Sequence, residues 1–198
     1  MEKHGIKEVL INLHYLSDQV ESFLNAYPTE IKFRFFYEKK LLGSAGTLRE
    51  NKDFVQNEES FFILYADNLT NYNLTLFSKF HRKKKQVLSM ALFETENPTM
   101  CGIAEFDNNN IVISFEEKPK HPKSNLANAG LYIAKPEIIG LIPNMDITDI
   151  GFHLLPKLIG KMAGWKTDDF LIDIGTMENL NKANKEWSEI IEGKNNDI

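Results

Sequence analysis

Cysteine is nearly absent from this chain of 198 residues, in which Cys101 is the single example. One cysteine cannot form an intramolecular disulfide framework, and it cannot supply a zinc site built from several thiolates. Long apolar runs are also lacking, and the first residues do not have the form of a signal peptide. We therefore expect a cytoplasmic protein that makes no membrane contact.

Positive charge is in short supply as well, because 23 basic residues stand against 28 acidic ones and the net charge is −5. Surfaces that bind nucleic-acid phosphates are basic, so we expect no nucleic-acid partner. The one basic run, His81–Lys85, is typical of a helix end, where the helix dipole favours cations. Repeats and low-complexity tracts are missing, and we expect one domain over residues 1–192, followed by a polar tail at 193–198.

What the chain does have is an alternation of short apolar runs with stretches of helical spacing. This order predicts an α/β fold, a Rossmann-like arrangement of three layers in which a mixed, mainly parallel sheet is flanked by helices. Strands are expected at 8–12, 31–37, 61–67, 86–93, 131–134 and 170–173, a hairpin at 103–117, and helices at 17–27, 44–54, 73–83, 148–162 and 176–190. Ser17 and Thr176 are expected to cap the first and the last of these helices.

Two of the expected strands end in a carboxylate. Phe61–Leu64 leads into Tyr-Ala-Asp67, and Phe170–Ile172 leads directly into Asp173. The carboxyl ends of strands form the edge at which α/β sheets bind ligands. Two acids at that edge could share a hard divalent cation, which could in turn hold a nucleotide phosphate. From position alone, a strand-end acid held by turn amides is an equally good interpretation of each.

Four segments occur in an order that resembles a known family. They are Glu38–Gly46, Leu64–Asp67, Phe115–Pro119 with Asn128–Gly130, and Ile172–Thr176. The chain resembles the sugar-1-phosphate nucleotidyltransferases, and within them the mannose-1-phosphate and manno-heptose-1-phosphate guanylyltransferases. The resemblance runs from Gly5 to about Ala183. Any one motif is weak evidence, whereas the ordered set is specific.

The resemblance implies an enzyme of the nucleotide-diphospho-sugar transferase fold that takes an NTP, GTP in this branch, and a sugar 1-phosphate. The products would be an NDP-sugar and pyrophosphate, so catalysis would consist mainly of positioning and charge neutralisation. Asp67 and Asp173 match the family's magnesium ligands, which makes Mg²⁺ the expected cofactor. Lys118 matches a lysine near the sugar phosphate, and we group it with the two aspartates as catalytic.

The remaining motifs imply substrate contacts. The nucleotide-base loop is matched by Leu42, Gly43, Ser44, Ala45 and Gly46, where glycine lets backbone approach a purine. The sugar contacts are matched by Gly102, Glu117, Asn128, Ala129 and Gly130. Two positions depart from the pattern: Ser44 replaces a threonine and keeps the hydroxyl, and Cys101 replaces the aromatic residue that usually precedes the glycine.

The family's glycine-rich Gly-x-Gly-Thr-Arg-Leu loop should precede Gly5, and the chain does not contain it. The strand before that loop is normally central, so we expect a sheet that lacks its first strand and has an exposed gap. Unpaired strand edges attract partners, which predicts a homo-oligomer or a partner that covers the gap. We also expect impaired turnover from this truncated chain alone.

Two other functions are compatible with the sequence. A non-catalytic paralogue could bind a nucleotide or nucleotide-sugar and regulate a full-length partner, and the absent loop favours it. A metal-dependent glycosyltransferase of similar topology would carry Asp-x-Asp after the strand, whereas this chain has Asp67-Asn68-Leu69.

Overall fold

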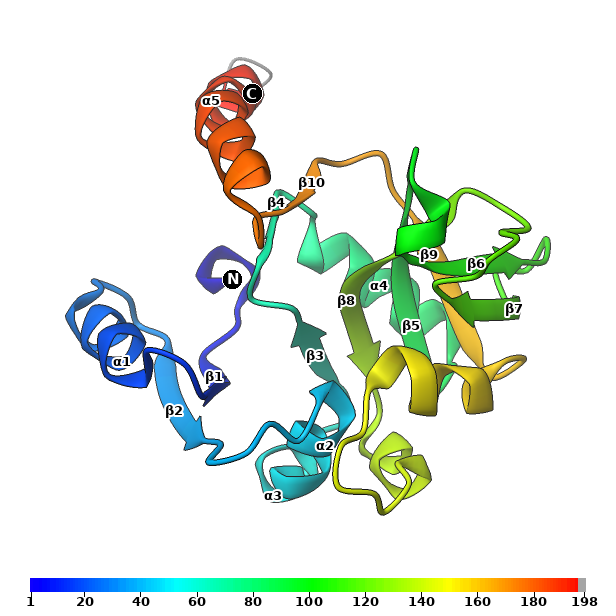
Figure 1. The fold of residues 1–198 in the computed structure, drawn as a ribbon, viewed down its shortest axis with the longest axis horizontal. Coiled ribbons are helices and arrows are strands. Elements are labelled where there is room, and N and C mark those ends of the chain that lie inside the picture. The colour runs from blue at the N-terminus through cyan, green and yellow to red at the C-terminus, as the bar shows by residue number, and fades with distance from the viewer. Residues whose placement is uncertain (196–198) are drawn as a thin grey trace.

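The computed structural model describes residues 1–195, and its centre is a mixed sheet (Figure 1). Strand β8 pairs antiparallel with β5 along its length, with β3 at its C-terminal half and with β6 near its N-terminus, while β9 is parallel to β5. Four of the six strands in this described sheet therefore run in the same direction. The strands are β3 (Phe61–Leu64), β5 (Leu88–Glu94), β6 (Gly102–Phe106), β7 (Val112–Glu117), β8 (Leu126–Ala134) and β9 (Met162–Lys166).

Helices cover both faces of this sheet, because its strands alternate between two hydrophobic clusters. On β5, Leu88, Met90 and Leu92 point into the first cluster, and Ala91 points into the second. The second cluster also contains Phe77 of helix α4 (Leu74–Lys84). The first face is covered by α2 (Ser44–Glu50), α3 (Lys52–Val55), the 3-10 helices Pro136–Leu141 and Leu155–Leu158, and the π-helix Ile150–Leu154. The predicted layered α/β fold is thus confirmed.

A smaller unit precedes the main sheet. Strands β1 (Glu8–Leu13) and β2 (Lys32–Tyr37) form a separate parallel pair, connected by helix α1 (Ser17–Ala26). Within residues 1–195, β1 pairs only with β2 and β3 only with β8, and Figure 1 shows the ribbon open between β1 and β3. Among the described residues the β1–β2 pair is thus separate from the main sheet, and the sequence led us to expect a gap in the sheet.

A second two-stranded sheet lies beside the end of β3. It pairs β4 (Asn68–Thr70) antiparallel with β10 (Leu171–Asp173), and helix α5 (Met177–Asn195) follows. Thr176 Oγ1 accepts the Asn179 amide at 3.2 Å, so it caps α5 as predicted. Of the predicted tail, residues 193–195 continue α5 and 196–198 lie outside the described residues. Two short 3-10 helices, Glu2–His4 and Pro98–Met100, complete the elements, and no described helix is long and apolar enough to span a membrane.

Two local predictions were wrong. Met162, which we expect to end a helix, instead begins strand β9. Gly160, at φ +80°, turns the chain between Pro156 and this strand. The sequence does not show the difference, because an apolar residue fits the periodicity of a helix and that of a strand. Ser17 does not cap α1: the cap is Leu16 at φ 53°, and the Ser17 hydroxyl bonds Asp18 instead.

Candidate active site

The two strand-end aspartates converge. Pairing of β4 with β10 sets Asp173 opposite Asn68, and the Ile174 amide donates to the Asp67 carbonyl at 2.8 Å. A Cβ at Gly175 would lie 2.9 Å from Asp173 Oδ1 and 3.7 Å from Asp67 Oδ2. Both side chains are exposed. No described group of three or more His, Cys, Asp or Glu side chains could hold a metal, so a cation here would take its other ligands from substrate or water.

The segment 42–46 is closed by the backbone of Thr148. The amides of Ala45 and Gly46 donate to the Thr148 carbonyl at 2.9 and 3.1 Å, and the Thr148 amide donates to the Leu42 carbonyl at 2.8 Å. A Cβ at Gly43, where φ is +77°, would come within 2.4 Å of the Thr148 oxygen. Glycine is therefore required at 43 by an internal contact, whatever the loop binds.

Glu117 lies between two glycines. A Cβ at Gly102 would be 2.5 Å from Glu117 Oε2, and one at Gly151 would be 2.3 Å from the same oxygen. Burial raises the pKa of the Glu117 carboxyl, the charge of Asp149 raises it further, and Lys118 partly offsets the shift. Lys118 itself is exposed, with its backbone at φ +50° and its amide donating to the Cys101 carbonyl.

Residues 128–130 connect the strand β8 to the aspartate turn. Gly130, at φ +64°, lies where the β5–β8 register shifts, and a Cβ there would be 2.6 Å from Asn68 Nδ2. Asn68 Nδ2 donates to the Ala129 carbonyl at 2.7 Å, and Asn128 Oδ1 accepts the Gly130 amide at 3.1 Å. These bonds set the predicted sugar-contacting residues beside Asp67.

The predicted residues thus fall into two groups. One holds Asp67 and Asp173 with residues 128–130, and the other holds residues 42–46 with Gly102, Glu117 and Lys118. Burial raises the thiol pKa of Cys101 most, and the charges of Glu117 in one group and Asp173 in the other both raise it further.

The sequence prediction missed the residues that join the two groups, which are Tyr65, Asn68, Thr148, Asp149 and Gly151. One of them carried a signal. Asp149 is followed by an apolar helical pattern, and its Oδ1 caps that helix through the amides of Gly151 and Phe152 at 2.8 and 3.3 Å.

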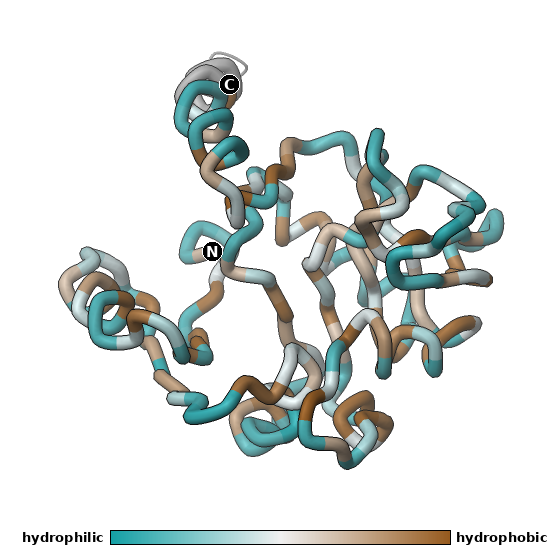
Figure 2. Tube along the Cα trace, in the orientation of Figure 1, coloured by the Kyte–Doolittle hydropathy of each residue, from teal (hydrophilic) through white to brown (hydrophobic). Residues whose placement is uncertain are grey.

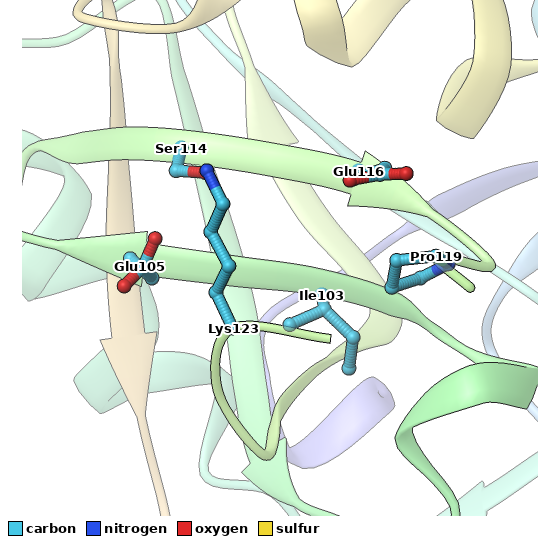
Figure 3. Close-up of a pocket in the computed structure, with 6 residues that line it drawn as sticks. All are labelled: Ile103, Glu105, Ser114, Glu116, Pro119 and Lys123. Carbon is cyan, nitrogen blue, oxygen red and sulfur yellow. The ribbon is translucent and has the colours of Figure 1, made fainter. Parts of the chain in front are cut away.

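A small pocket lies on the β6–β7 hairpin (Figure 3). It is lined by alternate residues of the two strands, whereas Gly102 and Glu117 belong to the other set. Its volume of about 10 Å³ is enough for one water molecule at most. We do not assign it a ligand. The lining residues are Ile103, Glu105, Ser114, Glu116, Pro119 and Lys123.

Comparison with known proteins decides the family. The family model described as "Nucleotidyl transferase" matches residues 1–189. The chain belongs to this family. A UTP–glucose-1-phosphate uridylyltransferase of Synechocystis is 29% identical over 80% of this chain and 45% of its own length. A probable mannose-1-phosphate guanylyltransferase of Arabidopsis thaliana is 30% identical over 86% of this chain and 54% of its own length.

Solved structures show the same fold. HddC from Yersinia pseudotuberculosis superposes with a TM-score of 0.79 at 24% identity, over 94% of this chain and 81% of that one. A putative glucose-1-phosphate thymidylyltransferase from Bacillus anthracis gives 0.81 at 23% identity, over 93% and 77%. The chain spans about half the length of the curated relatives it matches.

Proposed function

We propose that this chain binds a nucleotide, GTP or its nucleotide-sugar, together with a manno-configured sugar 1-phosphate, and serves nucleotidyl transfer between them. The observation that supports this most is the convergence of Asp67 and Asp173 on one point beside Gly175. A carboxylate pair of this kind offers hard oxygen ligands, and the phosphates of a nucleotide would complete the coordination of one Mg²⁺.

In this proposal each group of residues has one task. Residues 42–46 bind the base, Gly102, Glu117 and residues 128–130 bind the sugar, and Lys118 offers a point charge to the sugar phosphate. A phosphate oxygen of the sugar 1-phosphate attacks the α-phosphorus, the new P–O bond forms, and the bond to pyrophosphate breaks. Mg²⁺, when bound, would neutralise charge on the reacting phosphates. The chain's own residues hold the two substrates in line.

The choice of base and sugar follows from the resemblance and from names of relatives. Relatives named for GTP include those of Arabidopsis thaliana and Saccharomyces cerevisiae, but others are named for UTP and ATP. One HddC structure contains GMP-PN. We favour GTP and a mannose or manno-heptose phosphate because the motifs resemble that branch.

A second candidate function is a non-catalytic subunit that binds a nucleotide-sugar and acts with a partner. The strand edges of β1 and β3 that have no partner among the described residues favour it, since such edges tend to pair with another chain. We therefore expect the purified chain to form oligomers whose mass rises with concentration in light scattering. A monodisperse monomer across a hundredfold concentration range (roughly) would contradict the expectation.

The direct test is calorimetric binding of GDP-mannose and GTP with and without Mg²⁺. We expect binding that requires Mg²⁺, with little pyrophosphate release when mannose 1-phosphate is added. Asp67→Asn and Asp173→Asn should each weaken Mg²⁺-dependent binding about tenfold or more, because one charged oxygen ligand is lost. Asp53→Asn, an exposed acid on α3, is the matched control. Binding that survives in both variants would end the metal assignment.

A further inference from the structure

A chain of side-chain hydrogen bonds crosses the candidate site. On β8, Asn128 Nδ2 donates to the Tyr132 hydroxyl at 2.6 Å. The Tyr65 ring meets that of Tyr132 edge-on, and the Tyr65 hydroxyl interacts with the Tyr132 hydroxyl and with Ser44. Ser44 Oγ donates to Asp149 Oδ2 at 2.9 Å. This hydrogen-bond chain therefore connects β8 to residues 42–46 through Tyr132 on β8 and Tyr65, the residue after β3.

The direction of every bond in the chain is fixed by its two ends. The amide nitrogen of Asn128 can only donate, and an ionised Asp149 carboxylate can only accept. Each hydroxyl has one proton, so Tyr132 donates to Tyr65, Tyr65 to Ser44, and Ser44 to Asp149. Ser44 Oγ has a second lone pair, which accepts the Ile150 amide at 2.9 Å. In this series of hydrogen bonds, no proton is donated twice and no lone pair accepts twice.

The two tyrosines are well suited to transmit this order. Tyr132 is fully buried, and its ring meets that of Tyr65 edge-on with centroids 6.2 Å apart. Burial raises the pKa of both phenols, so both keep their protons at neutral pH and remain donors. In a buried setting an unsatisfied hydroxyl is costly, so the arrangement favours one pattern over its alternatives.

The consequence falls on the side-chain amide of Asn128. Its Nδ2 is held by Tyr132, and its Oδ1 accepts the Gly130 amide at 3.1 Å. An amide carries two N–H donors and two lone pairs. One of each is left, on the same planar group, which suits a pair of neighbouring sugar hydroxyls. If the amide flipped, both internal bonds would be lost.

We propose that Tyr65 and Tyr132 are positioning residues that hold the Asn128 amide in its ligand-binding orientation and tie that orientation to Ser44 of residues 42–46. The inference rests on the proposed function, in which Asn128 contacts the sugar and residues 42–46 contact the base. It adds that the sugar and base sides are coupled through the hydroxyls of Tyr65 and Tyr132, which touch neither ligand.

The test removes single hydroxyls and compares two ligands, GDP and GDP-mannose, by calorimetry. Tyr132→Phe and Tyr65→Phe should each weaken GDP-mannose about tenfold more than GDP, which is the worth of about one hydrogen bond. Tyr72→Phe is the matched control, since it removes a buried hydroxyl outside the chain and should leave both affinities within about twofold. Equal weakening of GDP and GDP-mannose, or none, would overturn the proposal.

A second measurement needs no ligand. In the ¹H–¹⁵N spectrum of the free protein, the Asn128 side-chain amide signals should move in Tyr65→Phe as well as in Tyr132→Phe, although in the hydrogen-bond chain Tyr132 stands between Tyr65 and Asn128. If Tyr65→Phe leaves those signals in place, the chain of hydrogen bonds does not orient the Asn128 side-chain amide, and the inference fails. If the wild-type protein binds neither ligand, the proposed function fails. The Asn128 amide signals would still show whether the chain of hydrogen bonds exists.

Discussion

Strands β1 and β5 carry similar apolar sequences but have different surroundings. On β5, the residues from Leu88 to Leu92 are fully buried. On β1, only Leu13 is buried, while Val9, Leu10 and Ile11 are intermediate. Figure 2 shows hydrophobic residues in both parts of the molecule. The difference lies in the neighbours, because within residues 1–195 β5 has a strand on each side and helices on both faces, whereas β1 has one strand partner.

The comparison shows that an apolar pattern identifies the face a strand can bury, and the number of packed layers decides how much it does bury. On α1, beside β1, Phe23 is 64% exposed. An open pocket of about 250 Å³ also lies between the β1–β2 pair and α3. It is lined by Glu8, Lys32, Phe33, Arg34 and Phe54.

Matched leucine truncations would give the largest effect. Leu92→Ala on β5 should lower the free energy of unfolding by about 3 kcal/mol, because a fully buried leucine leaves a cavity. Leu10→Ala on β1 should cost about 1 kcal/mol, because its side chain is only half-buried and the site is open. Urea denaturation of both variants measures the difference. Equal losses would show that the β1–β2 pair is packed as tightly as the main sheet.

Glu38 connects the two regions and gives the next largest effect. It is 5% exposed, and its carboxylate accepts the Leu42 amide at 3.2 Å, the Thr47 hydroxyl and, at 3.4 Å, the Asn12 amide. Glu38→Ala leaves these donors without an acceptor, so we expect a loss of about 2 kcal/mol.

Hydrogen exchange should show where that loss falls. The β1 and β2 amides should exchange faster in Glu38→Ala, while β5 and β8 keep their protection. The exposed Glu58→Ala is the control and should change neither stability nor exchange. Uniform loss of protection across both regions would mean that Glu38 does not act as a local junction.

The sequence predicts the packed region well because each strand there is a short apolar run bounded by turns. It does not predict β9, since Met162 fits a helical and a strand pattern equally and only the partner β5 decides. The exposure of α1 could not be predicted from the sequence either. The spacing of Phe23 and Tyr27 predicts an apolar helix face, but it does not show whether another element covers that face.

At the candidate site, the sequence predicts the residues that end strands or lie within motifs. Asp67 and Asp173 are predicted because each follows an apolar run. The link between Tyr65 and Tyr132 could not be found, because it depends on the register of two strands far apart in the chain. The packing that requires glycine at position 43 also could not be predicted, because Gly43 makes room for Thr148, which is far away in the sequence.

The buried His81 should make the stability of the packed region depend on pH. His81 is 4% exposed, its Nδ1 lies 2.8 Å from Ser89 Oγ, and burial lowers its pKa, with Lys135 and Arg82 acting in the same direction and Glu59 against it. Because the folded pKa lies below the unfolded one, the unfolded state gains its proton first as pH falls from about 6.5. The stabilisation is complete above that pH and is lost as pH falls through the folded pKa.

Replacing that histidine should therefore flatten the pH dependence. The wild-type protein should lose on the order of 1 kcal/mol more than His81→Gln between pH 7.5 and 5.5, measured by urea unfolding at several pH values. His121→Gln, at an exposed position, should follow the wild-type curve. Parallel curves for wild type and His81→Gln would show that the buried imidazole does not titrate in this range.

Substitution of Tyr72 should give the smallest effect. This residue places an unsatisfied hydroxyl inside the packed region. Its side chain is 3% exposed, its ring meets Trp165 edge-on, and its hydroxyl has no hydrogen-bond partner among the described residues. Burial raises the pKa of this phenol, so the group is neutral and its unsatisfied hydroxyl is the whole cost. Tyr72→Phe keeps the ring contact and should change stability by no more than about 0.5 kcal/mol, in the stabilising direction. Thermal unfolding of Tyr72→Phe should be compared with that of Tyr132→Phe, in which the lost hydroxyl is hydrogen-bonded. A loss as large as that of Tyr132→Phe would mean that the Tyr72 hydroxyl is satisfied by buried water.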